Sequence, residues 1–318
     1  MTSELHASAL IPGRRLDELT ATAALMRASL VPMQKLGSII DSVGSAVKLV
    51  QMSEDDRIFV PKTSSHDVVG AVTARDLGIA RRDVQEWIAT GFDVRSVLDD
   101  SYPETLHDIF NRPPVLFVRG HWTSSVPRPI AIVGAREASS EGLKQARLFS
   151  ERLVEKGFTI VSGLAKGIDT AAHDAALKIG GLTSAVLGTG LNHIFPPENG
   201  PLTQRILESG GALISQFFPQ QPPARWTFPM RNVVMSGICL ATIVIEAGQT
   251  SGARLQARVA LQHGRTVFLL RSLVEQHEWA RKYVEIGAYG TFAIPVETSG
   301  EIVERLEGTT RQKIVSVA

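Results

Sequence analysis

The chain has 318 residues, of which 44% are hydrophobic and 20% are charged, and its formal net charge is +1. This length leaves room for about two domains, the composition is typical of a globular protein in water, and no apolar run reaches the ~18–20 residues of a membrane span. The single cysteine, Cys239, excludes an internal disulfide and a cysteine-rich zinc site, and the N-terminal stretch has no secretory-signal pattern, so we expect a cytoplasmic protein.

The N-terminal region predicts a small helical domain. Residues 1–20 indicate a loose tail, and residues 21–52 carry an apolar helical pattern that is divided into short segments by Pro32, Gly37 and Gly44. Short helices joined by a glycine-containing turn are typical of a helix-hairpin module. Residues 53–80 are polar and weakly patterned, and we expect them to be partly flexible. We therefore assign residues 1–80 to a small helical domain, SAM-like or helix-hairpin-like, with flexible parts.

A lead-in segment, residues 81–127, connects this region to the main domain. A helix is predicted from Asp83 to Thr90, and residues 101–120 indicate a helix followed by the strand VLFVRG. Prolines 113 and 114 end the helix because they lack the backbone donor and clash with the preceding turn. The Rossmann-like domain, with this lead-in, is assigned to residues 81–318.

From Ile130 onward, short apolar runs of Ile, Val, Ala and Leu alternate with helical patterns. Helices are predicted over residues 140–156, 168–179, 201–209, 231–236, 253–262, 274–286 and 300–307, and the intervening runs, ending with TFAIP at 291–295, predict strands. Regular alternation with short connections predicts an α/β fold with a doubly wound, mainly parallel sheet of the extended Rossmann-like kind. The ligand should then lie beyond the carboxyl ends of the strands.

Two glycine-rich turns are candidates for anion binding. In the first, Gly134 and Arg136 precede a helix that Ser139 or Ser140 caps, so amides and a guanidinium converge there. In the second, lysine and small residues form a tight turn: Ser162, Gly163, Lys166 and Gly167. Neither turn has the GxGxxG spacing or the GKS/T ending, so NAD binding and ATP hydrolysis are disfavoured and no cofactor is expected.

Three further motifs carry polar residues that have more than one possible role or a structural role. Asp169 either caps a helix with His173 as its neighbour one turn on, or forms a catalytic acid-base pair with it. The loop TGLNHIFPPEN lacks metal-ligand spacing and is interpreted as a rigid wall of the pocket. Glu246 is interpreted as fixing a loop, with Arg254 paired to it or facing the pocket. No metal site is expected.

The segment ARWTFPMRN, residues 224–232, is the strongest candidate for a binding surface. It lies in a stretch from Ser209 to Ile245 that has no acidic residue, and it places Arg225 and Arg231 beside Trp226 and Phe228. Basic side chains interleaved with aromatic rings suit a polyanion with flat bases. The alternative is a loop that flanks the core and carries two chance arginines, with Trp226 and Phe228 both as core residues. In an intermediate interpretation, Trp226 is a core residue while Phe228 is exposed.

Five motifs in order resemble the DprA/Smf family of bacterial DNA-processing proteins: GAR at 134–136, SGLAKGID at 162–169, the run ending IFPPEN at 187–199, FPMRN at 228–232 and IEAGQTSGARLQARVALQHGR at 245–265. The resemblance implies a non-catalytic protein that binds and protects single-stranded DNA, promotes RecA loading in transformation or recombination, and forms a homodimer. The DNA-binding set that we predict is Gly134, Arg136, Ser162, Gly163, Lys166, Gly167, Arg225, Phe228, Arg231 and Asn232.

Two departures from the family pattern stand out. The turn VPMQKLG lacks the first glycine of the PGxG turn, and the segment after Leu270 lacks the expected PGS loop.

The alternative function is a nucleotide sensor, or an enzyme like the nucleotide phosphoribohydrolases of the same fold. Hydrolysis is disfavoured because EAGQTSGAR lacks their PGG and the glutamate after the turn. A DprA-derived module for phage defence or another DNA-handling system is a third possibility.

Overall fold

The computed structural model describes residues 13–28, 31–53, 56, 70–123 and 126–315, with side chains described up to residue 308. The chain divides into two compact units. Unit 1 comprises Met1–Tyr102 with Phe110–Phe117, and unit 2 comprises Pro103–Ile109 with Val118–Ala318. The division into residues 1–80 and 81–318 made from the sequence stays a prediction.

The described residues of unit 1 form four helices and one complete strand: α1 (Gly13–Ala28), α2 (Met33–Val43), α3 (Ala46–Gln51), α5 (Ala74–Ala89) and β1 (Asp93–Ser96). Gly44 ends α2 in the left-handed conformation, with φ of 74°, as a glycine in the predicted turn should. Gly37, by contrast, lies inside α2 and does not divide it. A β-carbon there would collide with the carbonyl oxygen of Arg112, so this glycine allows close approach of two backbone segments.

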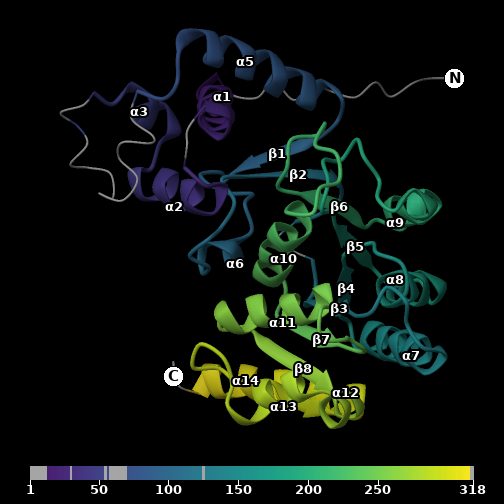
Figure 1. Ribbon diagram of the computed structural model, residues 1–318. Helices are drawn as coiled ribbons and strands as arrows, with labels where there is room; N and C mark the ends of the chain where they lie inside the picture. The colour runs from purple at the N-terminus through teal and green to yellow at the C-terminus, as the bar shows by residue number, and fades with distance from the viewer. Residues whose placement is uncertain (1–12, 29–30, 54–55, 57–69, 124–125, 316–318) are drawn as a thin grey trace, which may run out of the picture. The chain divides into compact units, whose positions relative to one another are not determined.

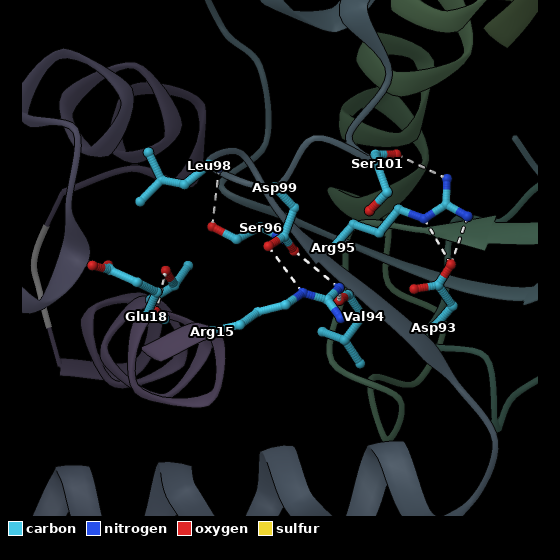
Figure 2. A network of polar contacts seen from close by, with 10 residues as sticks. Arg15, Glu18, Asp93, Val94, Arg95, Ser96, Leu98, Asp99 and Ser101 are labelled. Carbon is cyan, nitrogen blue, oxygen red and sulfur yellow. Dashed lines mark hydrogen bonds and ion pairs between the residues drawn. The ribbon is translucent and has the colours of Figure 1, made fainter. Parts of the chain in front are cut away.

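The loose tail predicted up to residue 20 is wrong for residues 13–20, which form the first half of α1. Arg15 anchors this helix: its guanidinium donates to both carboxylate oxygens of Asp99 at 3.0 and 3.1 Å and to the Val94 carbonyl at 3.0 Å (Figure 2). The Glu18 carboxylate accepts from the Ala46 amide at 2.7 Å and thereby caps α3. These long-range partners, invisible to a local pattern, are what order the segment.

Much of the weakly patterned region 53–80 lies outside the described residues, but its last part is helical. The helix α5 begins at Ala74, nine residues before the predicted start, because Thr73 and Asp76 form a reciprocal capping box. The Thr73 side chain accepts from the Asp76 amide at 3.2 Å, and Asp76 accepts from the Thr73 amide at 2.9 Å.

The sheet of unit 2 contains seven strands in the order β6-β5-β4-β3-β7-β8-β9, and the paired strands are parallel. Their bounds are β3 (Pro129–Val133), β4 (Thr159–Ser162), β5 (Thr183–Val186), β6 (Ala212–Ser215), β7 (Ala241–Val244), β8 (Thr266–Leu270) and β9 (Ile294–Val296). The strand β2 (Val115–Gly120) precedes them, with its last three residues in unit 2. β4 to β7 are buried along their whole length, which explains their continuous apolar sequences.

Helices cover both faces of this sheet. In Figure 1, α7, α8 and α9 lie on one face, whereas α10 and α11 lie on the other, and the helix-strand contacts agree. The helices of unit 2 are α6 (Glu104–His107), α7 (Ser140–Glu155), α8 (Ile168–Lys178), α9 (Gly200–Glu208), α10 (Thr227–Ile238), α11 (Gly252–Gln262), α12 (Arg271–Gln276), α13 (Glu278–Glu285) and α14 (Ser299–Val315). The predicted doubly wound, mainly parallel α/β fold is confirmed.

The end of the chain differs from the prediction in detail. The single helix expected over residues 274–286 is two helices, because His277 adopts an extended conformation between α12 and α13. The last strand lies at Ile294–Val296, three residues later than expected. Within the described residues, no helix is long and apolar enough to cross a membrane, and no group of three or more His, Cys, Asp or Glu could hold a metal ion.

Candidate functional site

The order of the strands creates a crevice between β3 and β7. From β3 the chain proceeds through β4, β5 and β6 on one side, whereas β7, β8 and β9 lie on the other side. The connections that follow β3 and β7 therefore lie on opposite faces of the sheet, and ligands of this fold class bind where such connections diverge. A cavity of about 540 Å³ lies there, lined by Val133 to Glu137 at the end of β3 and by residues 248, 250–253, 255 and 256 after β7.

A second cavity, of about 210 Å³, adjoins the first. Arg136, Ala165, Phe228 and Arg231 line both cavities, so the two form one continuous depression, which we call the groove. The far wall of the second cavity is made by residues 195–198. This position agrees with the interpretation of the IFPPEN segment as a rigid wall of the pocket.

Phe228 and Arg136 form the centre of the groove. Phe228 lies in the first turn of α10, half-buried, and its ring fits against Gly188, where a β-carbon would press on the ring. The Phe195 ring lies 5.6 Å from the Phe228 ring between centroids, and the Arg136 guanidinium carbon lies 5.4 Å from the Phe228 centroid. Arg136 is exposed and forms no ion pair with any residue that the structure describes. The groove thus offers a ring and an unopposed cation side by side.

A buried pair of opposite charges lies beneath this centre. Arg231 is 8% exposed, and its Nη1 donates to the Val186 carbonyl at 3.1 Å, while its guanidinium occupies space that any side chain at Gly163 would fill. Asp169 is 4% exposed. Burial lowers the pKa of Arg231 and raises that of Asp169, and in each case the opposite charge of the other counteracts the shift. Each charge therefore offsets part of the free-energy cost of burying the other.

Carboxylates of the protein already occupy the two glycine turns. Asp169 accepts hydrogen bonds from the amides of Gly163 at 3.1 Å and Ala165 at 3.3 Å, so these donors are not available to a ligand. At the start of α7, Glu246 accepts from the Ser139 amide at 3.1 Å and from the Ser139 hydroxyl at 2.6 Å. The expectation that free turn amides bind a phosphate is therefore wrong at these donors, and Glu246 fixes the loop as interpreted from the sequence.

A comparison with protein families shows to which family the chain belongs. A sequence model described as "DNA recombination-mediator protein A" matches residues 93–306, which is more than half of the chain. The chain belongs to the DNA recombination-mediator protein A family. The resemblance based on the five motifs is thereby confirmed.

Curated relatives of this family align with part of their length. Protein Smf of Escherichia coli (strain K12) is 44% identical over 169 residues, which are 53% of this chain and 45% of the relative. DNA processing protein DprA of Streptococcus pneumoniae is 41% identical over 175 residues, which are 55% of this chain and 61% of the relative. The chain spans about half the length of these relatives. The putative DNA processing protein DprA of Mycobacterium tuberculosis is 30% identical over 260 residues, which are 78% of this chain and 65% of the relative.

Solved structures of the family share the fold. The X-ray structure of DNA processing protein A from Streptococcus pneumoniae has a TM-score of 0.67 at 28% identity and covers 88% of this chain and 96% of that one. The structure of the Helicobacter pylori protein, described for its single-stranded DNA binding mode, has a TM-score of 0.59 at 22% identity and covers 69% and 98%. The second likeness shows the fold alone.

The groove of this family member collects seven of the ten predicted DNA-binding residues: Gly134, Arg136, Gly163, Lys166, Phe228, Arg231 and Asn232. The other three line neither cavity. Ser162 is buried and its hydroxyl donates to the Ile132 carbonyl at 2.6 Å, and Gly167, with φ of 76°, packs against the Ala135 carbonyl. Arg225 is exposed next to the groove-lining helix start.

The structure corrects the predicted position of Trp226 and adds Gln256 to the residues that line the groove. Trp226, proposed as the core residue, is 52% exposed and contacts Phe217 edge-on at 5.6 Å, whereas Phe228 is the half-buried one. Gln256 lines the larger cavity, is 1% exposed, and its side-chain Oε1 has no hydrogen-bond partner among the described residues. The sequence places Gln256 on the inner side of α11. Core residues occupy the same side, so this position alone did not identify Gln256 as a residue of the groove.

His173 is not an acid-base partner of Asp169 in this structure. The Thr183 hydroxyl donates to the Ile160 carbonyl at 2.8 Å, so it accepts from His173 Nδ1 at 2.7 Å, and Nε2 then carries the bare lone pair of a neutral ring. Burial lowers the pKa of His173 to about 3. His173 is completely buried and joins α8 to Thr183 of β5, whereas Asp169 holds the turn beneath the groove through the Gly163 amide.

The buried neutral His173 predicts a loss of stability in mild acid. Its pKa falls from 6.5 in the unfolded chain to about 3 in the folded chain, so between these values the unfolded chain alone takes up the proton. From pH 7 to pH 5 this costs the folded state about 2 kcal/mol. Urea unfolding at both pH values should show that His173→Gln loses less stability than the parent by this amount. Equal losses in the two proteins would contradict the assignment.

An ion pair at the edge of the groove predicts a gain in affinity for anions. Lys166 Nζ lies 3.0 Å from Glu198 Oε1, and both side chains are more than half exposed. A phosphate that binds Lys166 must compete with Glu198, so Glu198→Gln should raise the affinity for oligo-dT by about 1.5- to 5-fold at low salt. Anisotropy titration is the measurement, with the exposed Glu208→Gln as control. An equal rise in both variants would point to net charge and not to release of Lys166.

Proposed function

We propose that this protein binds single-stranded DNA in the groove and acts as a non-catalytic DNA-processing protein. The observation that carries the proposal is the Arg136 guanidinium 5.4 Å from the Phe228 ring at the diverging connections of a parallel sheet. Membership of the DNA recombination-mediator family supports the same substrate.

The proposed mode of binding uses the two chemical features of an unpaired strand. A base stacks on the half-buried Phe228 ring, which rests against Gly188, and stacking tolerates every base because each has a flat π face. Arg136 and Lys166 contact phosphates on either side of the stacked base, and these contacts release counterions and so depend on salt. The result is binding that discriminates little between sequences. Duplex DNA is disfavoured because its bases already stack on one another.

That the protein is non-catalytic is part of the proposal, and the roles of two carboxylates at the groove support it. Asp169 is bound to the amides of the turn beneath the groove, and Glu246 is bound to Ser139. Both carboxylates thus hold loops in place, and neither has its oxygens directed to a reacting group. A nucleotide-binding or phosphoribohydrolase-like role is the alternative, and incubation with AMP followed by an assay for free adenine distinguishes it.

The direct test is an anisotropy titration with labelled oligo-dT, competed by the same length of duplex and by mononucleotides. We expect competition by unlabelled single strands at equal concentration and by duplex or mononucleotide only at large excess. Equal competition by mononucleotides would favour the sensor alternative, and lack of any oligo-dT binding would overturn the proposal. RecA loading, a homodimer and contact of Arg225 with DNA stay predictions from the family resemblance. A cytoplasmic location and contact of Ser162 or Gly167 with DNA stay predictions from the sequence pattern.

A further inference from the structure

A third hollow, of about 300 Å³, adjoins the groove at α11. It is lined by residues of the turn after β7, by the first two turns of α11 and by Tyr283 of α13. Thr250, Ser251 and Leu255 line both this hollow and the larger cavity of the groove, so the two share one wall. A chain molecule that leaves the groove along this wall enters the hollow directly.

The charge of the hollow is positive. Arg254 and Arg258 line it four residues apart on α11, which places both side chains on the same side of the helix. None of its lining residues is acidic. Within the described part of the chain, neither arginine forms an ion pair with a carboxylate. Two like charges at this spacing repel each other, so an anion bound between them would relieve the repulsion.

Both guanidinium groups are held in position without an anion. Arg254 Nη1 donates to the Gln249 carbonyl at 2.7 Å, and its guanidinium carbon lies 5.8 Å from the Trp279 ring. Arg258 Nε and Nη2 donate to the Tyr289 hydroxyl at 3.2 and 3.0 Å. Because these bonds use only some of the five N–H donors of each arginine, the remaining donors are available. Side chains held in this way lose less entropy on binding a ligand.

We propose that the hollow binds backbone phosphates of a single strand that continues from the groove, with Arg254 and Arg258 as the contacting residues. This inference rests on the proposed function and extends the binding site from the carboxyl ends of β3 and β7 to α11 and α13. The shared wall favours DNA over a separate acidic protein segment, since a strand seated at Phe228 reaches the hollow without crossing another element.

The test compares two lengths of oligo-dT, about 5 and about 15 nucleotides, across a series of salt concentrations. The variant is Arg254→Gln with Arg258→Gln, and the control is Lys144→Gln with Arg147→Gln on the exposed side of α7, which removes the same charge outside all three hollows. We expect the variant to bind the short oligonucleotide within about twofold of the parent. With the long one, the slope of log affinity against log salt should flatten by about 0.7 for each phosphate that the variant no longer binds.

Each other outcome overturns the inference. Equal weakening with both lengths would place the arginines in the groove itself or in its folding, which thermal unfolding of the variant distinguishes. Unchanged binding of the long oligonucleotide, or an equal change in the control, would remove the hollow from the DNA path. A polyglutamate peptide that competes for the parent but not for the variant would assign it to an acidic protein segment. If the parent binds no oligo-dT at all, the proposed function fails as well, so the two failures are distinguishable.

Discussion

Replacing Phe228 with Ala is expected to weaken the binding of oligo-dT by about 5- to 150-fold, with little change in its salt dependence. The reason is that the ring supplies a stacking platform, which is worth ~1–3 kcal/mol per base and involves no counterion release. Phe228→Leu keeps an apolar side chain without a flat face and should be nearly as weak as Phe228→Ala. Phe228→Tyr keeps the ring and should bind like the parent. Anisotropy titrations at several salt concentrations give both quantities.

Two further variants make this expectation specific. Arg136→Ala should also weaken binding, but it should flatten the salt dependence by about 0.7 in the logarithmic slope, because it removes one cation that binds a phosphate. Trp226→Ala removes a ring that is 52% exposed and lines neither cavity, so its affinity should stay within about twofold of the parent. Stronger weakening by Trp226→Ala than by Phe228→Ala would place the stacking platform outside the groove.

Replacing Asp169 with Ala is expected to destabilise the protein by on the order of 3 kcal/mol, which is a large part of the stability of a typical domain. The substitution leaves the Arg231 guanidinium buried without a compensating negative charge, and it removes the acceptor of the Gly163 and Ala165 amides. Leaving buried polar groups unpaired is more costly than the original interactions are favourable. Urea unfolding of variant and parent at the same pH measures the difference.

The matched control lies on the same helix. Asp174 has an exposed ion pair with Arg205, and removing an exposed pair costs at most about 1 kcal/mol. Asp174→Ala should therefore be close to the parent in its unfolding free energy. Similar losses in the two variants would show that Asp169 stabilises α8 in an ordinary way and does not neutralise Arg231. Increased or unchanged stability of Asp169→Ala would contradict the account of the buried charges.

Local patterns in the sequence were sufficient for the architecture of unit 2. Fully buried strands appear as runs of Ile, Val, Ala and Leu, and the Ser139 cap starts α7 at the predicted residue. The same patterns predict the groove only in part, because glycine turns look alike whether or not their amides are free. The carboxylate that occupies the start of α7, Glu246, lies 107 residues further along the chain than Ser139. No local pattern contains that contact.

The choice between Trp226 and Phe228 is a second example. Both are aromatic, both stand beside arginines, and both lie at the start of α10. What distinguishes them is Gly188, in the connection after β5, whose lack of a side chain makes room for the Phe228 ring. This partner comes from another connection of the sheet, so composition and spacing within residues 224–232 cannot reveal it. Position within the fold, and not residue type, decides which ring faces the groove.

The central claim is that an unpaired strand lies in the groove formed by the connections after β3, β4, β5 and β7. Photo-crosslinking with oligo-dT in which one thymine is replaced by 5-iodouracil, followed by mass spectrometry of the peptides, tests it most directly. The account predicts crosslinks at Phe228 and within residues 134–137 and 195–198 that disappear when unlabelled oligo-dT is added in excess. Crosslinks confined to residues 13–102, with none in these three places, would contradict it.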